Sequence, residues 1–229
     1  MTTPSERSRD RRPTRAGRGL DPRTTWSGRR SRHAVVWEGV CFRRLLRPRR
    51  CRTYLKHAIQ ATGSSTYNGA GYKKKEGDSG IRPDPPRSAG DHFPILVIEA
   101  GNSESLRLLH KDKDWWFNNS PPGQPRGDVR IVVLVKVERR RQRILVEQWY
   151  RGRQSPSHTV IIMPHTDKPI ALYDASHWIV ESAPMVIPFE DVFLRLPTRP
   201  RETNLVLTEQ FFTNLGMQCW QSHTKVSDA

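Results

Sequence analysis

The clearest pattern along the chain is a series of apolar runs separated by one stretch with helical periodicity. The run PILVIE, residues 94–99, is aliphatic and rich in β-branched side chains, which predicts a strand covered on both faces. Apolar residues at three- and four-residue spacing then predict a helix over residues 104–119, with Ser103 as its N-cap. A second buried strand is predicted over residues 128–138, and the alternating segment 143–149 follows it after a polar turn.

This order of elements predicts the fold class. A strand, a helix and a strand joined by connections of this length imply a crossover between two parallel strands, and the following hairpin adds an antiparallel strand. We therefore expect an α/β or α+β fold built on a small mixed sheet with a strand–helix–strand crossover. Upstream, a short strand is expected around residues 72–81, ended by the prolines that follow it.

The last third of the chain is less regular. The segment HTVIIMP, residues 158–164, predicts one more strand, and residues 186–193 predict a turn that leads into a short helical piece. Residues 205–221 carry Phe211, Leu215 and Cys219 at four-residue spacing, so we expect a closing C-terminal helix there.

Charge divides the chain unevenly. Residues 1–60 hold 17 Lys and Arg against four acidic residues, whereas the other 169 residues hold 22 basic and 19 acidic ones. The first 33 residues have almost no side chains to bury, and residues 1–60 as a whole are predicted to be a basic, largely disordered N-terminal region. Such a region would favour phosphate backbones without sequence preference.

Other features limit the class of protein. The longest apolar runs are far shorter than the roughly 20 residues of a membrane span, so no membrane partner is expected. Three cysteines without paired spacing, and no recognisable signal peptide, favour an intracellular location, nuclear or cytoplasmic. No two histidines have metal-ligand spacing, and His110 is interpreted as a surface or hydrogen-bonded residue.

The chemistry of the chain is predicted to centre on Glu99. This carboxylate ends an apolar strand, where it is costly unless a partner neutralises it. Ligand sites in parallel sheets lie beyond the carboxyl ends of the strands. A hydrogen bond or an arginine would satisfy the charge, and so would a metal ion. Mg²⁺ binds one or two carboxylates and completes its shell with water. Of the nearest upstream acids, Asp78 is the best second ligand, because Asp84 lies among prolines and Asp91 is too close in sequence to fold back.

The segments that carry these acids have a recognisable arrangement. GDSGIRP, then FPILVIEAGNSESLRLLHKDKDWWFNNS, then GDVRIVVLVKV and ILVEQW, resemble the PD-(D/E)XK, or restriction endonuclease-like, superfamily. More narrowly, with VIPFEDVFLRLP and NLVLTEQFFTNL, they resemble a group of uncharacterised fungal proteins of that type. The resemblance covers roughly residues 70–220. It implies a nuclease-like core at residues 61–150, with residues 151–229 as a C-terminal extension packed on it.

The resemblance assigns roles to individual residues. It implies that Asp78 and Glu99 are the two catalytic acids and hold Mg²⁺, with nucleic acid as the substrate. The superfamily's lysine is expected two residues after the second acid, and this sequence has Gly101 there. Lys136, near the end of the neighbouring parallel strand, is the preferred substitute. Arg107, one turn into the helix, and the run Lys73 to Lys75 beside Asp78 are its rivals.

Three functions follow from these observations. The first is a metal-dependent phosphodiester hydrolase, or nuclease. The second is a relative that has lost catalysis and binds nucleic acid, which Gly101 favours. The third is a protein-interaction module. Trp115 and Trp116 are assigned to packing, and Asp112 to the solvent face of the helix. The sequence makes no prediction of the oligomeric state.

Overall fold

The structure is a computed structural model and covers the larger part of the chain. It describes residues 59–63, 65–69, 73–87, 89, 91–120, 123, 127–165 and 175–227. The predictions for residues 1–58 lie outside these described residues.

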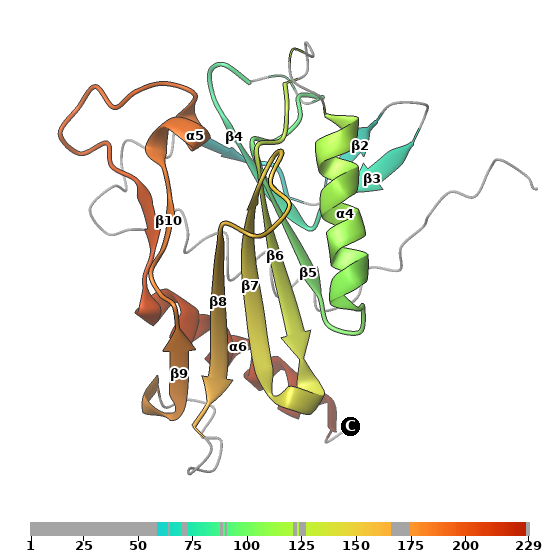
Figure 1. Ribbon diagram of the computed structural model, residues 1–229, viewed down its shortest axis with the longest axis vertical. Helices are drawn as coiled ribbons and strands as arrows, with labels where there is room; N and C mark the ends of the chain where they lie inside the picture. Colours follow the sequence, from blue (N-terminus) through green and yellow to red (C-terminus); the bar gives the residue numbers. More distant parts are fainter. Residues whose placement is uncertain are drawn as a thin grey trace, which may run out of the picture.

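A seven-stranded sheet forms the centre of the molecule (Figure 1). Its strand order is β1-β4-β5-β6-β7-β8-β9, and only β5 and β6 are parallel to each other. All other neighbours are antiparallel, so the fold is α+β with a mostly antiparallel sheet larger than the small sheet expected from the sequence. The strands are β1 (Ile59–Ala61), β4 (Ser79–Pro83), β5 (Leu96–Gly101), β6 (Ile131–Glu138), β7 (Arg143–Tyr150), β8 (His158–Pro164) and β9 (Trp178–Glu181).

The remaining elements lie outside the central sheet. Among the described residues they comprise two two-stranded ribbons, three α-helices and two short 3₁₀ turns. They are β2 (Thr66–Asn68), β3 (Lys74–Glu76), α4 (Leu106–Asn119), η3 (Arg139–Arg141), η4 (Ala175–His177), β10 (Met185–Ile187), α5 (Phe189–Phe193), β11 (Leu205–Leu207) and α6 (Glu209–Ser227).

The predicted strand–helix–strand unit is present as β5, α4 and β6, and β7 returns antiparallel as expected. Several predicted boundaries differ from the structure, since β5, α4 and β6 each begin two or three residues later than predicted. Strand β5 runs two residues beyond Glu99, because the ladder to β6 continues as far as the pair Gly101 and Lys136. The N-cap of α4 is Ser105 rather than Ser103, since the Ser105 hydroxyl accepts the Leu108 N–H at 3.3 Å.

One face of the sheet is covered by α4 and by the β2–β3 ribbon. Leu109 and Trp116 of α4 are almost fully buried against alternate residues of β5 and β6, such as Val97 and Leu134. Tyr67 of β2 stacks on Phe93, with ring centroids 5.4 Å apart. Because strand side chains alternate, Glu99 lies on this α4 face, two residues after Val97.

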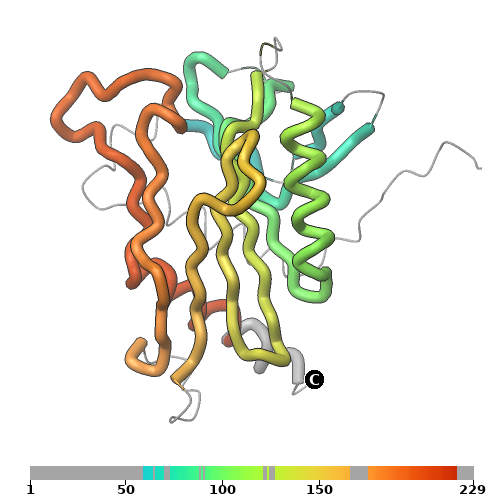
Figure 2. The backbone as a smooth tube through the Cα atoms, in the orientation of Figure 1, coloured from blue at the N-terminus to red at the C-terminus, as the bar shows by residue number. Residues whose placement is uncertain are grey.

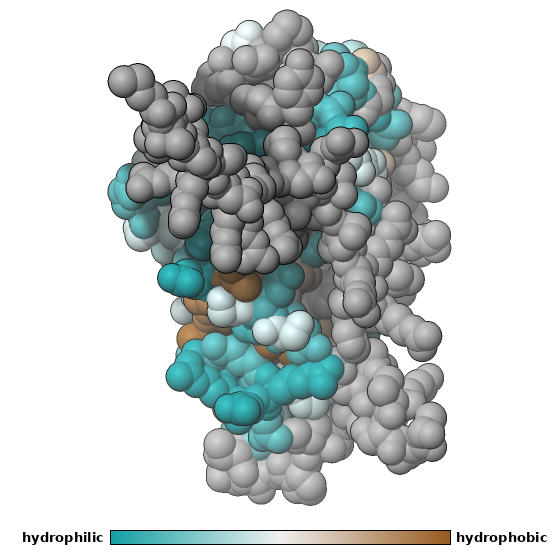
Figure 3. All heavy atoms as spheres, turned by 90° about the vertical axis from the view of Figure 1, so that its right-hand side faces the viewer, coloured by the Kyte–Doolittle hydropathy of each residue, from teal (hydrophilic) through white to brown (hydrophobic). Residues whose placement is uncertain are grey.

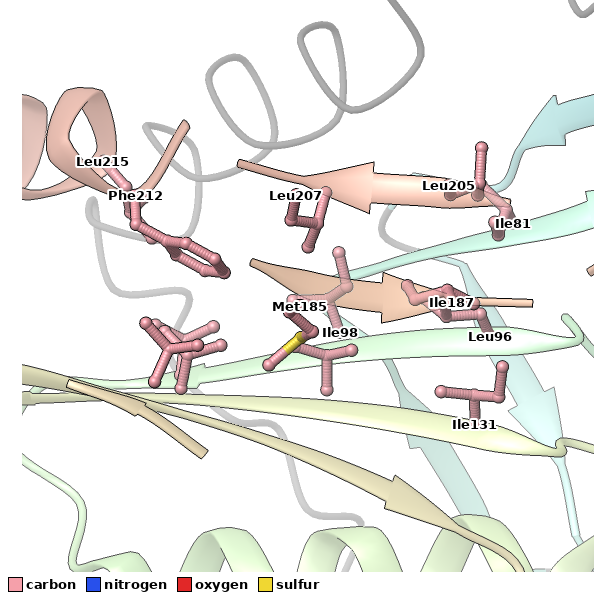
Figure 4. Packing of buried hydrophobic residues seen from close by; sticks show 14 of the residues in the cluster. Ile81, Leu96, Ile98, Ile131, Met185, Ile187, Leu205, Leu207, Phe212 and Leu215 are labelled. Carbon is pink, nitrogen blue, oxygen red and sulfur yellow. The ribbon is translucent and has the colours of Figure 1, made fainter. Parts of the chain in front are cut away.

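The opposite face carries the larger core. Strands β10 and β11 form a ribbon over the sheet, and α5 and α6 complete the cover (Figure 4). Figure 4 shows that the ribbon's side chains meet those of the sheet strands, with α4 on the far side of the sheet. The cluster combines residues from both sides of position 150, so the C-terminal elements share their core with the strands before them. Its labelled members are Ile81, Leu96, Ile98, Ile131, Met185, Ile187, Leu205, Leu207, Phe212 and Leu215.

The closing helix is present as α6, but the segment before it is a strand. Leu205 and Leu207 are buried and Val206 is 51% exposed, which is the two-residue alternation of β-structure. The sequence therefore contains a strand and a helix where a single helix was predicted. Figure 2 shows the path from α4 across the sheet to these C-terminal elements on the opposite side. Among the described helices, none is long and apolar enough to span a membrane.

Candidate functional site

The structure brings Asp78 and Glu99 together at one edge of the α4 face. Asp78 immediately precedes β4, and the antiparallel pairing of Ser79 with Ile98 places it opposite the residue after Ile98. Its Oδ2 atom accepts the backbone N–H of Ala100 at 2.8 Å. Two acids far apart in sequence therefore lie beside each other, because one hydrogen bond fixes the first against the backbone next to the second.

Glu99 is a buried carboxylate with only 5% of its surface exposed. Its Oε1 atom accepts the indole N–H of Trp116 at 2.5 Å and lies 3.4 Å from the ammonium of Lys75. Burial raises the pKa of Glu99 to about 8, and the nearby carboxylates of Asp78 and Asp112 push it the same way against the opposing effects of Lys75 and Trp116. Near neutral pH this carboxyl group therefore keeps its proton unless a further cation joins it.

Lys75 is the cation that contacts this site. It lies on β3, and its Nζ atom is 2.6 Å from Asp112 of α4 and 3.4 Å from Glu99. Burial lowers the pKa of Lys75, but the two carboxylates outweigh this effect, so the pKa is raised and the side chain stays charged. Asp112, predicted for the solvent face, instead joins the helix to this lysine because α4 lies directly beside the β2–β3 ribbon.

The surroundings of the Asp78 carboxyl group also favour its neutral, protonated form. Its pKa is raised mainly by burial, with smaller contributions from Glu104 and Asp112, while the Ala100 N–H and Lys75 act in the opposite direction. Two adjacent acids with raised pKa values can bind a proton or a cation with a gain in free energy.

Lys136 lies beside the position where the superfamily lysine was expected. It is paired in register with Gly101, on the neighbouring parallel strand. Its ammonium donates to the backbone carbonyl of Asn102 at 2.6 Å, three residues after Glu99, and burial lowers its pKa. These contacts connect Lys136 to the loop after β5, whereas Lys75 contacts the carboxylates.

Helix α4 explains why residue 101 is a glycine. A Cβ atom built at Gly101 would lie 3.1 Å from both methyl carbons of Leu109, which is itself buried. A side chain at this position would require Leu109 to shift by a few tenths of an ångström. The close approach of α4 to the strand end therefore favours a glycine here.

Other basic side chains lie away from the two acids. Arg107 is exposed on α4, and Lys73 and Lys74 are exposed on the β2–β3 ribbon. Lys113 is buried with its ammonium 3.8 Å from the ring centroid of Trp149 on β7. None of them makes a described contact with Asp78 or Glu99 in the part of the chain that the structure covers.

A second buried carboxylate on the α4 face was missed by the sequence analysis. Glu147 of β7 is 7% exposed, and its Oε2 atom lies 2.8 Å from both the His110 Nε2 and the Trp149 Nε1 atoms. Sheet register aligns it with Leu134, which is itself aligned with Glu99. The alternation in RILVEQW contained the signal, because it places Glu147 on the same face as Leu145 and Trp149.

The arrangement of acids sets a limit on metal binding. Within the described residues, no group of three or more His, Cys, Asp or Glu side chains is placed to hold a metal ion. Asp78 and Glu99 meet the lower requirement of Mg²⁺, which takes one or two carboxylates and fills its shell with water or phosphate oxygens. Both side chains carry hard oxygen ligands, and the raised pKa values mean that each carboxylate would gain from a nearby cation.

Comparison with known proteins adds no family assignment. No protein-family model matches this chain, and no curated protein is significantly similar to it. The proposals below therefore depend on the sequence motifs and on the geometry of the site.

Proposed function

We propose that this chain is a nuclease-like protein of the PD-(D/E)XK, restriction endonuclease-like type, which hydrolyses nucleic-acid phosphodiesters with Mg²⁺. The observation that carries the proposal is the carboxylate of Asp78 held at the Ala100 amide, next to the buried carboxylate of Glu99. The order of elements supports it, since β5, α4 and parallel β6 are flanked by antiparallel β4 and β7.

Asp78 and Glu99 would hold the ion. Burial keeps the pKa values of both acids above the ordinary range, with smaller contributions from neighbouring carboxylates, and a divalent cation would reverse that penalty. When bound, the ion would lower the pKa of a water molecule and offset charge on the scissile phosphate.

Lys75 rather than Lys136 is the lysine we assign to this chemistry. Its ammonium remains charged and lies within 3.4 Å of Glu99, while Asp112 holds it from the other side. A fixed positive charge at this position stabilises negative charge that develops on the phosphate oxygens. Lys75→Met should therefore reduce cleavage more than Lys136→Met.

The test is cleavage by the full chain of single-stranded DNA, duplex DNA and RNA, with Mg²⁺ or Mn²⁺ and with EDTA. We expect metal-dependent cleavage by the wild type and its loss in Glu99→Gln. Glu147→Gln is the matched control, since it makes the same change at an equally buried position on the same face. Circular dichroism of each variant verifies that it is folded.

Two results would refute the activity. One is the absence of cleavage over the whole substrate panel with either metal. The other is equal loss in Glu99→Gln and Glu147→Gln, which would indicate a structural effect. Calorimetric titration of Mn²⁺ into the wild type and into an Asp78→Asn, Glu99→Gln double variant tests the ion directly, and the double variant should show no binding.

The alternative is a non-catalytic nucleic-acid-binding or protein-interaction module on the same scaffold. Gly101 in the lysine position favours it, since Leu109 packs closely against the place where the usual side chain would begin. This reading predicts nucleic-acid binding in EDTA that survives Glu99→Gln, or a protein partner retained after nuclease treatment. An intracellular location, nuclear or cytoplasmic, suits either function.

A further inference from the structure

The turn between β6 and β7 carries a dense group of positive charges. Residues 136–143, here named the basic turn, contain five basic side chains and one acidic one, for a net charge of +4. The three arginines of η3 are all exposed, and the side chain of Arg141 is 68% exposed. Nothing in the proposed chemistry uses these arginines.

The basic turn has a defined backbone. The N–H of Gln142 donates to the Arg139 carbonyl at 3.1 Å and closes the 3₁₀ turn, with Gln142 itself in the left-handed region at φ 48°. Glu138 pairs with Arg143 and lies 3.7 Å from Arg141, so it neutralises only part of the charge. The arginines therefore project from a hydrogen-bonded hairpin end.

The basic turn is also joined to the loop that follows Glu99. The Lys136 ammonium donates to the Asn102 carbonyl at 2.6 Å, and the Arg139 guanidinium donates to the Asn102 side chain at 3.0 Å. Asn102 is three residues after Glu99, a span of about 10 Å in extended chain. Figure 1 shows this turn and the loop into α4 at the same end of the sheet.

Part of the surface on this side is hydrophilic. Figure 3 shows the α4 side of the molecule, and the described residues in its lower part are mostly hydrophilic. The arginines of η3 have no aromatic residue between them, which favours contact with a phosphate backbone over stacking with bases.

We infer that the basic turn binds the sugar–phosphate backbone of a nucleic acid and directs it towards the Asp78 and Glu99 carboxylates. One strand of a duplex carries a phosphate per roughly 3.4 Å of helix axis, so a 10 Å span corresponds to about three phosphates. The inference rests on the proposed function for the identity of the site. The binding itself requires no cleavage.

The test is a salt titration of binding. Fluorescence anisotropy of a labelled 20-nucleotide single strand and of its duplex is measured in EDTA, with the full chain, between 50 and 200 mM salt. The variant Arg140→Gln, Arg141→Gln removes two charges from the turn. The control variant Arg199→Gln, Arg201→Gln removes two charges from the exposed loop between α5 and β11.

We expect the turn variant to bind roughly tenfold more weakly at 100 mM salt, with the slope of log K against log salt reduced by about 2. The control variant should match the wild type, and the basic N-terminal region contributes equally to all three proteins. A competing acidic peptide tests whether the turn instead recognises an acidic protein segment.

The outcomes separate the two proposals. Because EDTA prevents metal-dependent cleavage, loss of binding in the turn variant supports the inference whether or not the protein is a nuclease. Equal slopes for the turn variant and the wild type overturn it, even if cleavage is observed. Equal losses in the turn and control variants also overturn it, as does preferential binding of the acidic peptide or the absence of any nucleic-acid binding at 50 mM salt.

Discussion

Because the pKa of Glu99 is raised, the free energy of unfolding should depend on pH. Comparison with the Glu99→Gln variant measures this dependence. The folded protein holds the Glu99 proton up to about pH 8, whereas an exposed glutamate releases it near pH 4.5. Between these two values the folded state binds more protons than the unfolded state, so the free energy of unfolding falls as pH rises. The neutral glutamine has no such dependence and still offers an oxygen to the Trp116 N–H.

The size of the effect follows from the two pKa values. At about 1.36 kcal/mol per pKa unit, the separation corresponds to roughly 5 kcal/mol over the whole range. The part that falls between pH 6 and pH 9 is about 2–3 kcal/mol. The free energy of unfolding of the wild type, relative to Glu99→Gln, should decrease by this amount over that interval.

Urea unfolding of both proteins at pH 6, 7, 8 and 9, followed by circular dichroism, measures this difference. Comparison of the two proteins at each pH cancels the contributions of histidines and termini. Adding Mg²⁺ at pH 9 should restore stability to the wild type but not to the variant, because only the wild type has the ligand. Parallel stability curves from pH 6 to pH 9 would refute the reasoning, since Glu99 would then titrate in its ordinary range.

Two further substitutions test the packing around the site. Gly101→Lys should destabilise the protein by about 1–3 kcal/mol in urea unfolding, because its side chain meets Leu109, and Leu109→Ala should relieve part of that cost in a double-mutant cycle. Additive effects of the two changes would contradict the crowding. Trp116→Phe replaces the indole with a smaller phenyl ring and removes the N–H donated to Glu99; the loss of volume costs the same at every pH, and the lost hydrogen bond should add about 1–3 kcal/mol at pH 9 and less at pH 6. A cost independent of pH would show that the hydrogen bond does not serve the carboxylate.

The local pattern of apolar residues was sufficient to predict most strands of the central sheet. The apolar runs gave β5, β6, β7 and β8 to within a few residues, because a strand buried on one or both faces shows its period directly in the sequence. The same pattern predicted α4 and the presence of α6. It was wrong for β11, where a three-residue strand is too short to show its period before the helix begins.

Only part of the candidate site could be predicted from the sequence. Glu99 could be recognised because a carboxylate inside an apolar strand needs a partner. Its actual partners could not be recognised in this way. Lys75 comes from an exposed ribbon, and Trp116 was assigned to packing. Lys136 was placed on the correct strand end, but its ammonium is bonded to the Asn102 carbonyl.

By itself, then, the sequence determined most of the central strands and the main helices, and it identified Glu99 as a carboxylate too costly to leave without a partner. These are local properties, set by side-chain periodicity and by the free energy of burying charge. Only the tertiary structure decided which groups surround Glu99. Those contacts depend on strand register and on how closely α4 and the β2–β3 ribbon approach the sheet, and both result from many weak packing interactions between residues distant in sequence.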